Sequence, residues 1–148
     1  MSLEENRSSR DYLFGRMLAI AENIESCALD LIQESRDTNA ARSMQRFADN
    51  PCSTWRHIEI ALEPYRARLK RDSPEVLAIR EKLLDSVIGL FKGEEFVSTD
   101  KLSGEFLLGY HCQRADLWRA EDACWTKRGY RQKQMPGPTG NLTFWVRH

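Results

Sequence analysis

Apolar residues recur at helical spacing along most of the chain, and they predict a series of amphipathic helices. In the first stretch, residues 11–34, they return at three- and four-residue steps after Ser8 and Ser9. The spacing predicts one long helix with a single core stripe, which consists of Leu13, Met17, Ile20, Ile24, Ala28 and Leu31. Gly15 weakens its first turns by up to ~1 kcal/mol relative to alanine.

Two further helices are predicted between residues 38 and 71. Thr38 can cap a short helix over residues 39–50, and Asn50 before Pro51 ends it. Its core face consists of Ala41, Met44 and Phe47. Ser53 or Thr54 then caps a helix over residues 55–71, which Pro64 should kink or split. The apolar face of this helix consists of Trp55, Ile58, Leu62, Tyr65 and Leu69.

The boundary at Ser73 and Pro74 is typical of a helix start, with serine as the cap and proline at the first helical position. Gly93 is the expected stop of this fourth helix, whose inward face consists of Val76, Ile79, Leu83, Val87 and Leu90. A polar loop over residues 93–102 leads to a fifth helix capped by Ser103. Its shared face consists of Phe106, Leu107, Tyr110, Arg114 and Leu117.

After about Trp118 the apolar period ends. The segment "QMPGPTGN" is rich in turn residues, and "LTFWVRH" would be a lone strand without a partner. We therefore expect a tail that is either irregular and flexible or docked against the helices. The pattern predicts an all-α protein: a helical bundle of about five helices over residues 1–120, followed by an irregular or flexible tail over residues 121–148.

Composition narrows the class of protein. The chain has 148 residues, 41% hydrophobic and 30% charged, which is normal for a globular domain. No apolar run approaches the ~18 residues of a membrane span, and the first residues lack a secretory signal, so we expect a cytoplasmic protein without a membrane partner. Four cysteines and three histidines are scattered, so we expect free thiols and neither a metal nor another cofactor.

The stretch "SGEFLLGYHCQRADLW" raises the question of catalysis, because His111 stands next to Cys112. Adjacent residues on a helix point about 100° apart, so this pair does not form a nucleophile and its base. Glu94 and Glu95 are interpreted as solvated loop charge. We expect no catalytic residue and no enzyme. Gly104 and Gly109 lack side chains and could let another backbone come close.

The net charge is zero, with 22 basic and 22 acidic residues, but residues 36–71 carry 8 basic and 4 acidic ones. Arg42 and Arg46 lie one helical turn apart within this block. Four more cations crowd the end of the third predicted helix: Arg66, Arg68, Lys70 and Arg71. They could simply complement the helix dipole, worth ~0.3–1 kcal/mol each. The alternative is a patch that follows a phosphate backbone.

Three blocks of the sequence, at residues 10–25, 38–69 and 102–118, resemble a known family. They are "RDYLFGRMLAIAENIE", "TNAARSMQRFADNPCSTWRHIEIALEPYRARL" and "LSGEFLLGYHCQRADLW". Together they resemble the C-terminal helical region of the large subunit of type I-C CRISPR Cascade, the bacterial RNA-guided DNA surveillance complex. In that system the same region is also made separately as a small subunit from an internal methionine, and a start at Met1 fits such a product.

The resemblance implies a non-enzymatic subunit that packs along the guide-RNA filament and holds the R-loop, chiefly the displaced non-target strand. Its expected partners are the backbone and large subunits of Cascade, the R-loop itself and another copy of the chain. The DNA-contact candidates are Arg42, Arg46, Arg56, Arg66, Arg68, Lys70, Arg71 and Arg114. The alternative hypotheses are a purely architectural subunit that never touches DNA, and a thiol enzyme using Cys112.

Overall fold

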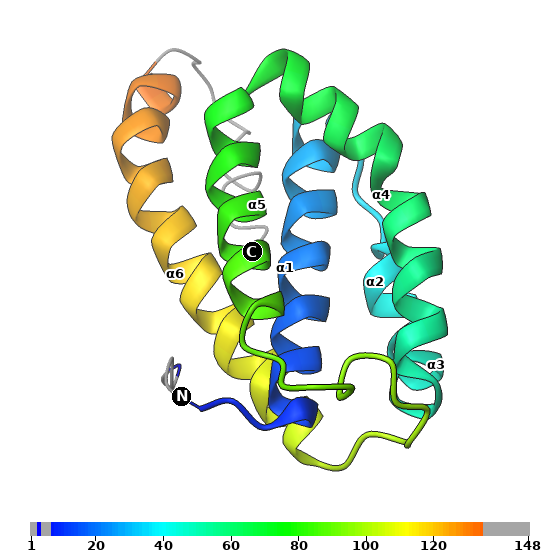
Figure 1. Cartoon of the computed structure of the whole chain (residues 1–148). Helices are drawn as coiled ribbons and strands as arrows, with labels where there is room; N and C mark the ends of the chain where they lie inside the picture. Colours follow the sequence, from blue (N-terminus) through cyan, green and yellow to red (C-terminus); the bar gives the residue numbers. More distant parts are fainter. Residues whose placement is uncertain (1–2, 4–6, 135–148) are drawn as a thin grey trace. The chain divides into compact units, whose positions relative to one another are not determined.

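A computed structural model describes residue 3 and residues 7–134, with side-chain burial described up to residue 119. These residues form six α-helices and no strand, which confirms the predicted all-α fold (Figure 1). The helices are α1 (Arg10–Leu31), α2 (Asn39–Arg42), α3 (Met44–Asp49), α4 (Pro51–Asp72), α5 (Pro74–Ile88) and α6 (Glu105–Gln134). The chain divides into two compact units, Met1–Leu117 and Trp118–His148.

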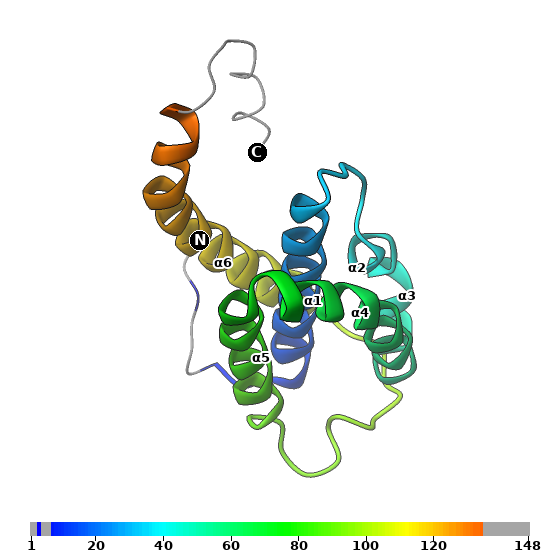
Figure 2. The ribbon, with the colours of Figure 1, turned by 90° about the horizontal axis from the view of Figure 1, so that it is seen from above.

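Helix α1 is the centre of the first unit. It begins where the Ser9 hydroxyl accepts a hydrogen bond from the Tyr12 amide, and every side chain of residues 12–25 is buried. Figure 2 shows α1 between α5 on one side and α2, α3 and α4 on the other. The prediction of a single apolar stripe is therefore wrong, because partners surround this helix. Leu31, the last residue of the predicted stripe, is 41% exposed.

Helix α1 and the first turns of α6 touch through their backbones. A Cβ atom added at Gly15 would overlap the carbonyl oxygen of Phe106, and one added at Gly109 would overlap that of Tyr12. The close approach expected at Gly109 is thus confirmed. The one expected at Gly104 is wrong, because nothing lies within 4 Å of a Cβ atom placed there.

The second predicted helix is interrupted at Ser43, which separates α2 from α3. The Thr38 cap is confirmed, since its Oγ1 accepts from the Ala41 amide at 3.0 Å. Phe47 is buried as predicted, but Ala41 and Met44 are only half-buried. Inside α2, Ala40 is buried instead.

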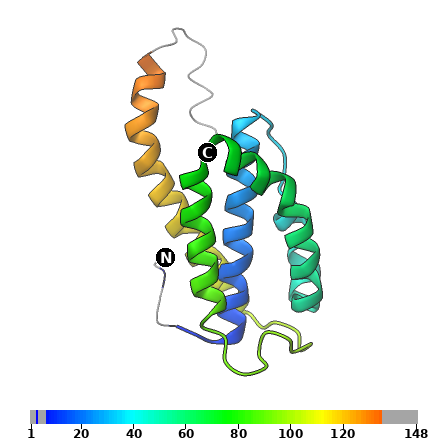
Figure 3. The same ribbon diagram turned by 45° about the horizontal axis from the view of Figure 1, so that its top comes forward.

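Helix α4 begins at Pro51, earlier than the predicted cap at Ser53 or Thr54. Proline suits the first helical position because its missing N–H would have had no partner there. The helix runs unbroken through Pro64, and its axis bends along its length (Figure 3). The predicted face is buried apart from Tyr65, which is half-buried.

Helix α5 begins at Pro74 as predicted, yet it presents a different face to the core. Its buried residues are Leu77, Arg80, Leu84 and Val87. Of the predicted face, Val76 and Leu83 are half-buried, Leu90 is exposed and Ile79 is 65% exposed. The buried face of α5 includes Arg80, so a search for apolar periodicity does not recognise it. The helix ends at Ile88 with Gly89 as its cap, and Gly93 lies in the following loop.

Helix α6 begins at Glu105 and continues to Gln134. Residues 121–134 are therefore helical, whereas the sequence predicted an irregular or flexible segment there. They lack an apolar stripe, but many are strong helix formers such as alanine, lysine, arginine and glutamine. The predicted turn segment after Gln134 and the lone strand lie outside the described residues. On the core side of α6, Phe106, Tyr110 and Leu117 are buried as predicted, whereas Leu107 is 44% exposed.

Candidate nucleic-acid interface

The eight basic residues predicted to contact DNA fall into two groups according to their ionic partners. Four lie within ion-pair distance of a carboxylate, namely Arg66, Arg68, Arg71 and Arg114. Among the described residues, the other four have no ion pair, namely Arg42, Arg46, Arg56 and Lys70. The second group has no carboxylate of the described residues within ion-pair distance, so its charges are the less compensated ones.

The cations near the end of α4 are paired within the bundle. Arg66 is 17% exposed and lies 3.4 Å from Glu81 of α5 and 3.8 Å from Glu63. Arg68 and Arg71 approach the two carboxylate oxygens of Asp72 at 3.5 and 3.6 Å. Arg66 therefore joins α4 to α5, whereas Arg68 and Arg71 pair within the last turns of α4, and the structure favours a local structural role for all three.

Arg114 is paired with a carboxylate of α1. Its Nε lies 3.3 Å from Glu22 Oε1, which also accepts the Tyr110 hydroxyl at 2.6 Å. Burial raises the pKa of Tyr110, and its hydrogen bond to the Glu22 carboxylate raises it further. The hydroxyl therefore stays protonated, and this group of three joins α6 to α1.

The arginines without an ion pair among the described residues lie on α2, α3 and the start of α4, three helices that contact one another. Arg42 donates to Asn39 Oδ1 at 2.6 Å, and Arg46 and Arg56 are exposed. The carbonyl of Arg46 accepts the Thr54 hydroxyl at 3.1 Å, so α3 lies against the first turn of α4.

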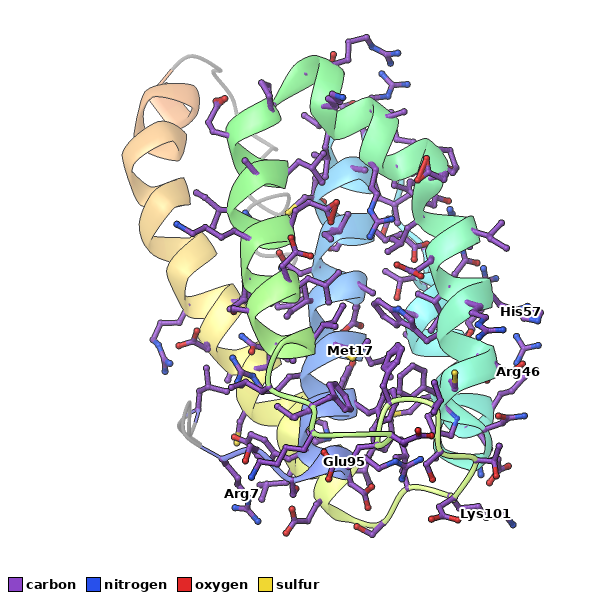
Figure 4. The ribbon with its side chains drawn as sticks, viewed as in Figure 1. Arg7, Met17, Arg46, His57, Glu95 and Lys101 are labelled. Carbon is purple, nitrogen blue, oxygen red and sulfur yellow. The ribbon has the colours of Figure 1, made fainter. Side chains whose placement is uncertain are left out.

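Arg46 and His57 project away from the bundle on the same side (Figure 4). We call Arg42, Arg46, Arg56 and His57 the basic edge. The prediction that Arg42 and Arg46 share one helix is wrong, because Ser43 separates their helices. Sequence reasoning had also left out His57, whose only signal was its place beside Arg56.

Lys70 is exposed and unpaired among the described residues, but it lies far from the basic edge. It follows Arg56 by fourteen residues on α4, or about 21 Å along the helix axis. The acids Asp49 and Glu59 lie close in sequence to Arg46 and Arg56 and reduce the positive charge of the basic edge. Neither is within ion-pair distance of its arginines. The structure thus brings together three of the eight predicted residues.

No phenylalanine, tyrosine or tryptophan among residues 7–119 is classed as exposed. Most are buried, and Tyr65, Phe91, Phe96 and Trp118 are half-buried. Tyr65 is also covered by Arg36, whose guanidinium carbon lies 5.7 Å from the ring centroid. The basic edge can therefore attract phosphate by charge and hydrogen bonding, and His57 is its only aromatic side chain.

His111 and Cys112 point in different directions. Cys112 is buried, whereas His111 is exposed and stands edge-on to Tyr110. Cys27 and Cys52 are half-buried and, like Cys112, free, as predicted. Among the described residues, no three histidine, cysteine or carboxylate side chains are grouped to hold a metal ion. No helix in that part of the chain is long and apolar enough to cross a bilayer.

The fold and the basic edge define an all-α protein with an exposed cationic surface and a buried aromatic core. The chain belongs to the family described as CRISPR-associated protein (Cas_Csd1), which matches residues 1–118. The match agrees with the resemblance carried by the three sequence blocks, and it ends beside the boundary between the two units. No curated protein matches the chain.

Proposed function

We propose that this chain is a non-catalytic subunit of a type I-C Cascade complex that binds the backbone of DNA and stabilises the R-loop. Its main ligand is the displaced non-target strand. One observation carries the proposal: in a member of a CRISPR-associated family, three exposed arginines without an ion pair among the described residues lie on three helices that contact one another. The complex would act in the cytoplasm in antiviral defence.

This role needs charge and no base recognition. In RNA-guided complexes the guide reads the sequence by base pairing, and the protein holds the displaced strand by its backbone. A guanidinium can donate two parallel hydrogen bonds to one phosphate, and each neutralised phosphate releases condensed counterions. The basic edge has the groups for this, and among the described residues no phenylalanine, tyrosine or tryptophan is classed as exposed.

The expected protein partners are the backbone and large subunits of the complex and a second copy of this chain. The outer side of α5 supports such contacts, because Ile79 is 65% exposed and Leu83 and Val76 are half-buried beside it. That apolar strip also favours the second candidate function, a purely architectural subunit that braces the filament without touching DNA.

A charge-deletion pair tests the proposed function in the assembled complex. Arg42→Ala with Arg46→Ala removes two unpaired charges from the basic edge, and we expect R-loops to dissociate faster. Single-strand binding by the free chain should weaken, and its salt dependence should fall by about 0.7 per lost phosphate contact. The matched control is Arg68→Ala with Arg71→Ala, which removes two arginines that are already paired with Asp72.

Equal R-loop lifetimes for the wild type, the edge variant and the control variant would refute DNA binding through this edge. Photo-reactive DNA in the assembled complex separates the two candidates further. The DNA-binding role predicts an adduct on the segment that contains α2, α3 and the start of α4. The architectural role predicts no adduct on this chain.

A further inference from the structure

The loop between α5 and α6 is fastened to the start of α1. The Arg10 guanidinium donates hydrogen bonds to three carbonyl oxygens of this loop, those of Glu95, Ser98 and Asp100, at 3.0, 3.2 and 2.7 Å. The same guanidinium carbon lies 5.3 Å from the ring centroid of Phe14, a buried residue. A single arginine, itself held by the core, therefore sets the path of the loop backbone.

The end of this loop is also fastened to α3. The Leu102 amide donates to the Ala48 carbonyl oxygen at 2.8 Å, one residue before α3 ends. Lys101 thus stands between two residues whose backbones are held from opposite sides, Asp100 by Arg10 and Leu102 by Ala48. Its backbone is ordered before any ligand arrives, which lowers the entropy cost of a contact made by its side chain.

The side chain of Lys101 is exposed, and it points away from the bundle at the same margin as Arg46 (Figure 4). Among the described residues it has no ion pair. Two exposed acids lie near Lys101: Asp100 precedes it in the chain, and Asp49 follows Ala48, to which Leu102 is hydrogen-bonded. They make the electrostatic potential at Lys101 less positive, but neither forms an ion pair with it. Lys101 is thus a cation without an ion pair, on an ordered loop that is hydrogen-bonded to α3, and it adds to the positive charge of the basic edge.

We propose that Lys101 is a further phosphate contact, which continues the basic edge from α3 onto the loop before α6. The inference rests on the proposed function, since the ligand is the same DNA strand. It adds a residue from a block of the sequence, residues 72–110, that is acidic overall and had contributed no DNA-contact candidate.

The test compares binding of a fluorescent single-stranded oligonucleotide to the full chain over a range of salt concentrations. Lys101→Ala should weaken binding at low salt and reduce the slope of log K against log salt by about 0.7, the value for one phosphate contact. Lys101→Arg should keep the slope. Asp100→Asn should tighten binding, because it removes a negative charge beside the contact.

Lys82→Ala is the matched control, since Lys82 is an exposed lysine on α5 without an ion pair among the described residues. If Lys101→Ala behaves as Lys82→Ala does while the Arg42 and Arg46 double variant weakens binding, the inference is wrong and the proposed function stands. If the double variant also binds as the wild type does, or the wild type does not bind, both are wrong. All five substituted side chains are exposed, and unchanged thermal unfolding would show that each variant folds.

Discussion

Buried polar residues join α1 to the helices around it. Arg16 Nε donates to Gln113 Oε1 at 2.7 Å, and Arg80 donates to the side chain of Asn23, with all four residues buried. Such a bond adds only ~0.5–1.5 kcal/mol net, but removing one partner exposes the other to a desolvation cost of ~1–3 kcal/mol. These residues therefore specify which helices pack against α1 more than they add to its stability.

Two carboxylates have pKa values displaced in opposite directions. Burial raises the pKa of Glu25, although the hydrogen bonds from the Asn39 and Ala40 amides and the charges of Arg36 and Arg42 act against this shift. Hydrogen bonds from Ser9 and Arg7 lower the pKa of Glu105. A raised carboxyl pKa means that the folded state holds the proton more tightly, and a lowered one means the reverse.

The free energy of unfolding should therefore respond to these residues in two pH windows. The contribution of Glu25 is fully present below its ordinary pKa of 4.5 and is lost as the pH rises through its folded value. The contribution of Glu105 is present above 4.5 and is lost as the pH falls through its folded value. Urea unfolding followed by circular dichroism across this range measures both.

Glu25→Gln should flatten the pH dependence above 4.5 only, and Glu105→Gln should flatten it below 4.5 only. Each variant is the control for the other, because each removes one ionisable group. A change in the same window for both variants would contradict the assignment.

At the scale of elements, the crossing of α1 and α6 depends on two glycines. Gly15→Ala and Gly109→Ala should each lower the free energy of unfolding by ~1–3 kcal/mol or more, because the added methyl group meets backbone that cannot move aside. Chemical denaturation of each variant measures the loss.

Gly104→Ala is the matched control for this crossing. The space around Gly104 is open, and alanine there restricts the unfolded chain, so we expect a neutral effect or a gain of up to ~1 kcal/mol. A loss at Gly104 as large as that at Gly15 would contradict the assignment of the Gly15 and Gly109 losses to the helix crossing, because helix propensity favours alanine over glycine.

Helix α5 shows which of its features an apolar pattern could predict and which it could not. Its start at Pro74 follows from local chemistry and was predicted correctly. Its buried face was not, because Arg80 occupies a core position through its bond to Asn23, 57 residues away. Apolar periodicity cannot include a charged residue whose partner is so distant, so the prediction selected Ile79, which is 65% exposed.

At the scale of the whole molecule, a net charge of zero coexists with a cationic edge. The arginines at the end of α4 lie within ion-pair distance of Glu63, Glu81 or Asp72, whereas those of α2 and α3 have no carboxylate that close among the described residues. The folded chain therefore presents positive charge in one place although its acids and bases are equal in number. Net charge alone would predict no affinity for nucleic acid.

A strand held by this edge should bind equally well without its bases. We expect an abasic oligonucleotide to match an intact one of equal length, since stacking on an exposed phenylalanine, tyrosine or tryptophan would add ~1–3 kcal/mol per base and none of these is classed as exposed among residues 7–119. Competition between the two strands measures the difference. A loss of about tenfold or more on removing the bases would contradict binding by the backbone alone.

The sequence by itself determined the family, the all-α class and most helix starts. Caps such as Thr38 and the Ser73–Pro74 boundary act within one turn of chain, so their chemistry can be read locally. The three blocks that carry the family resemblance likewise need no contact to be recognised.

Only the tertiary structure decided which faces are buried and which charges remain available. Arg114 is paired with Glu22 across 92 positions, and Arg66 reaches Glu81 on another helix. Spacing along the chain could not distinguish these paired arginines from Arg42 and Arg46, because the sequence shows all of them as cations on predicted helices. A cation remains available for a ligand where folding places no carboxylate within ion-pair distance of it. The packing of distant parts of the chain decides this.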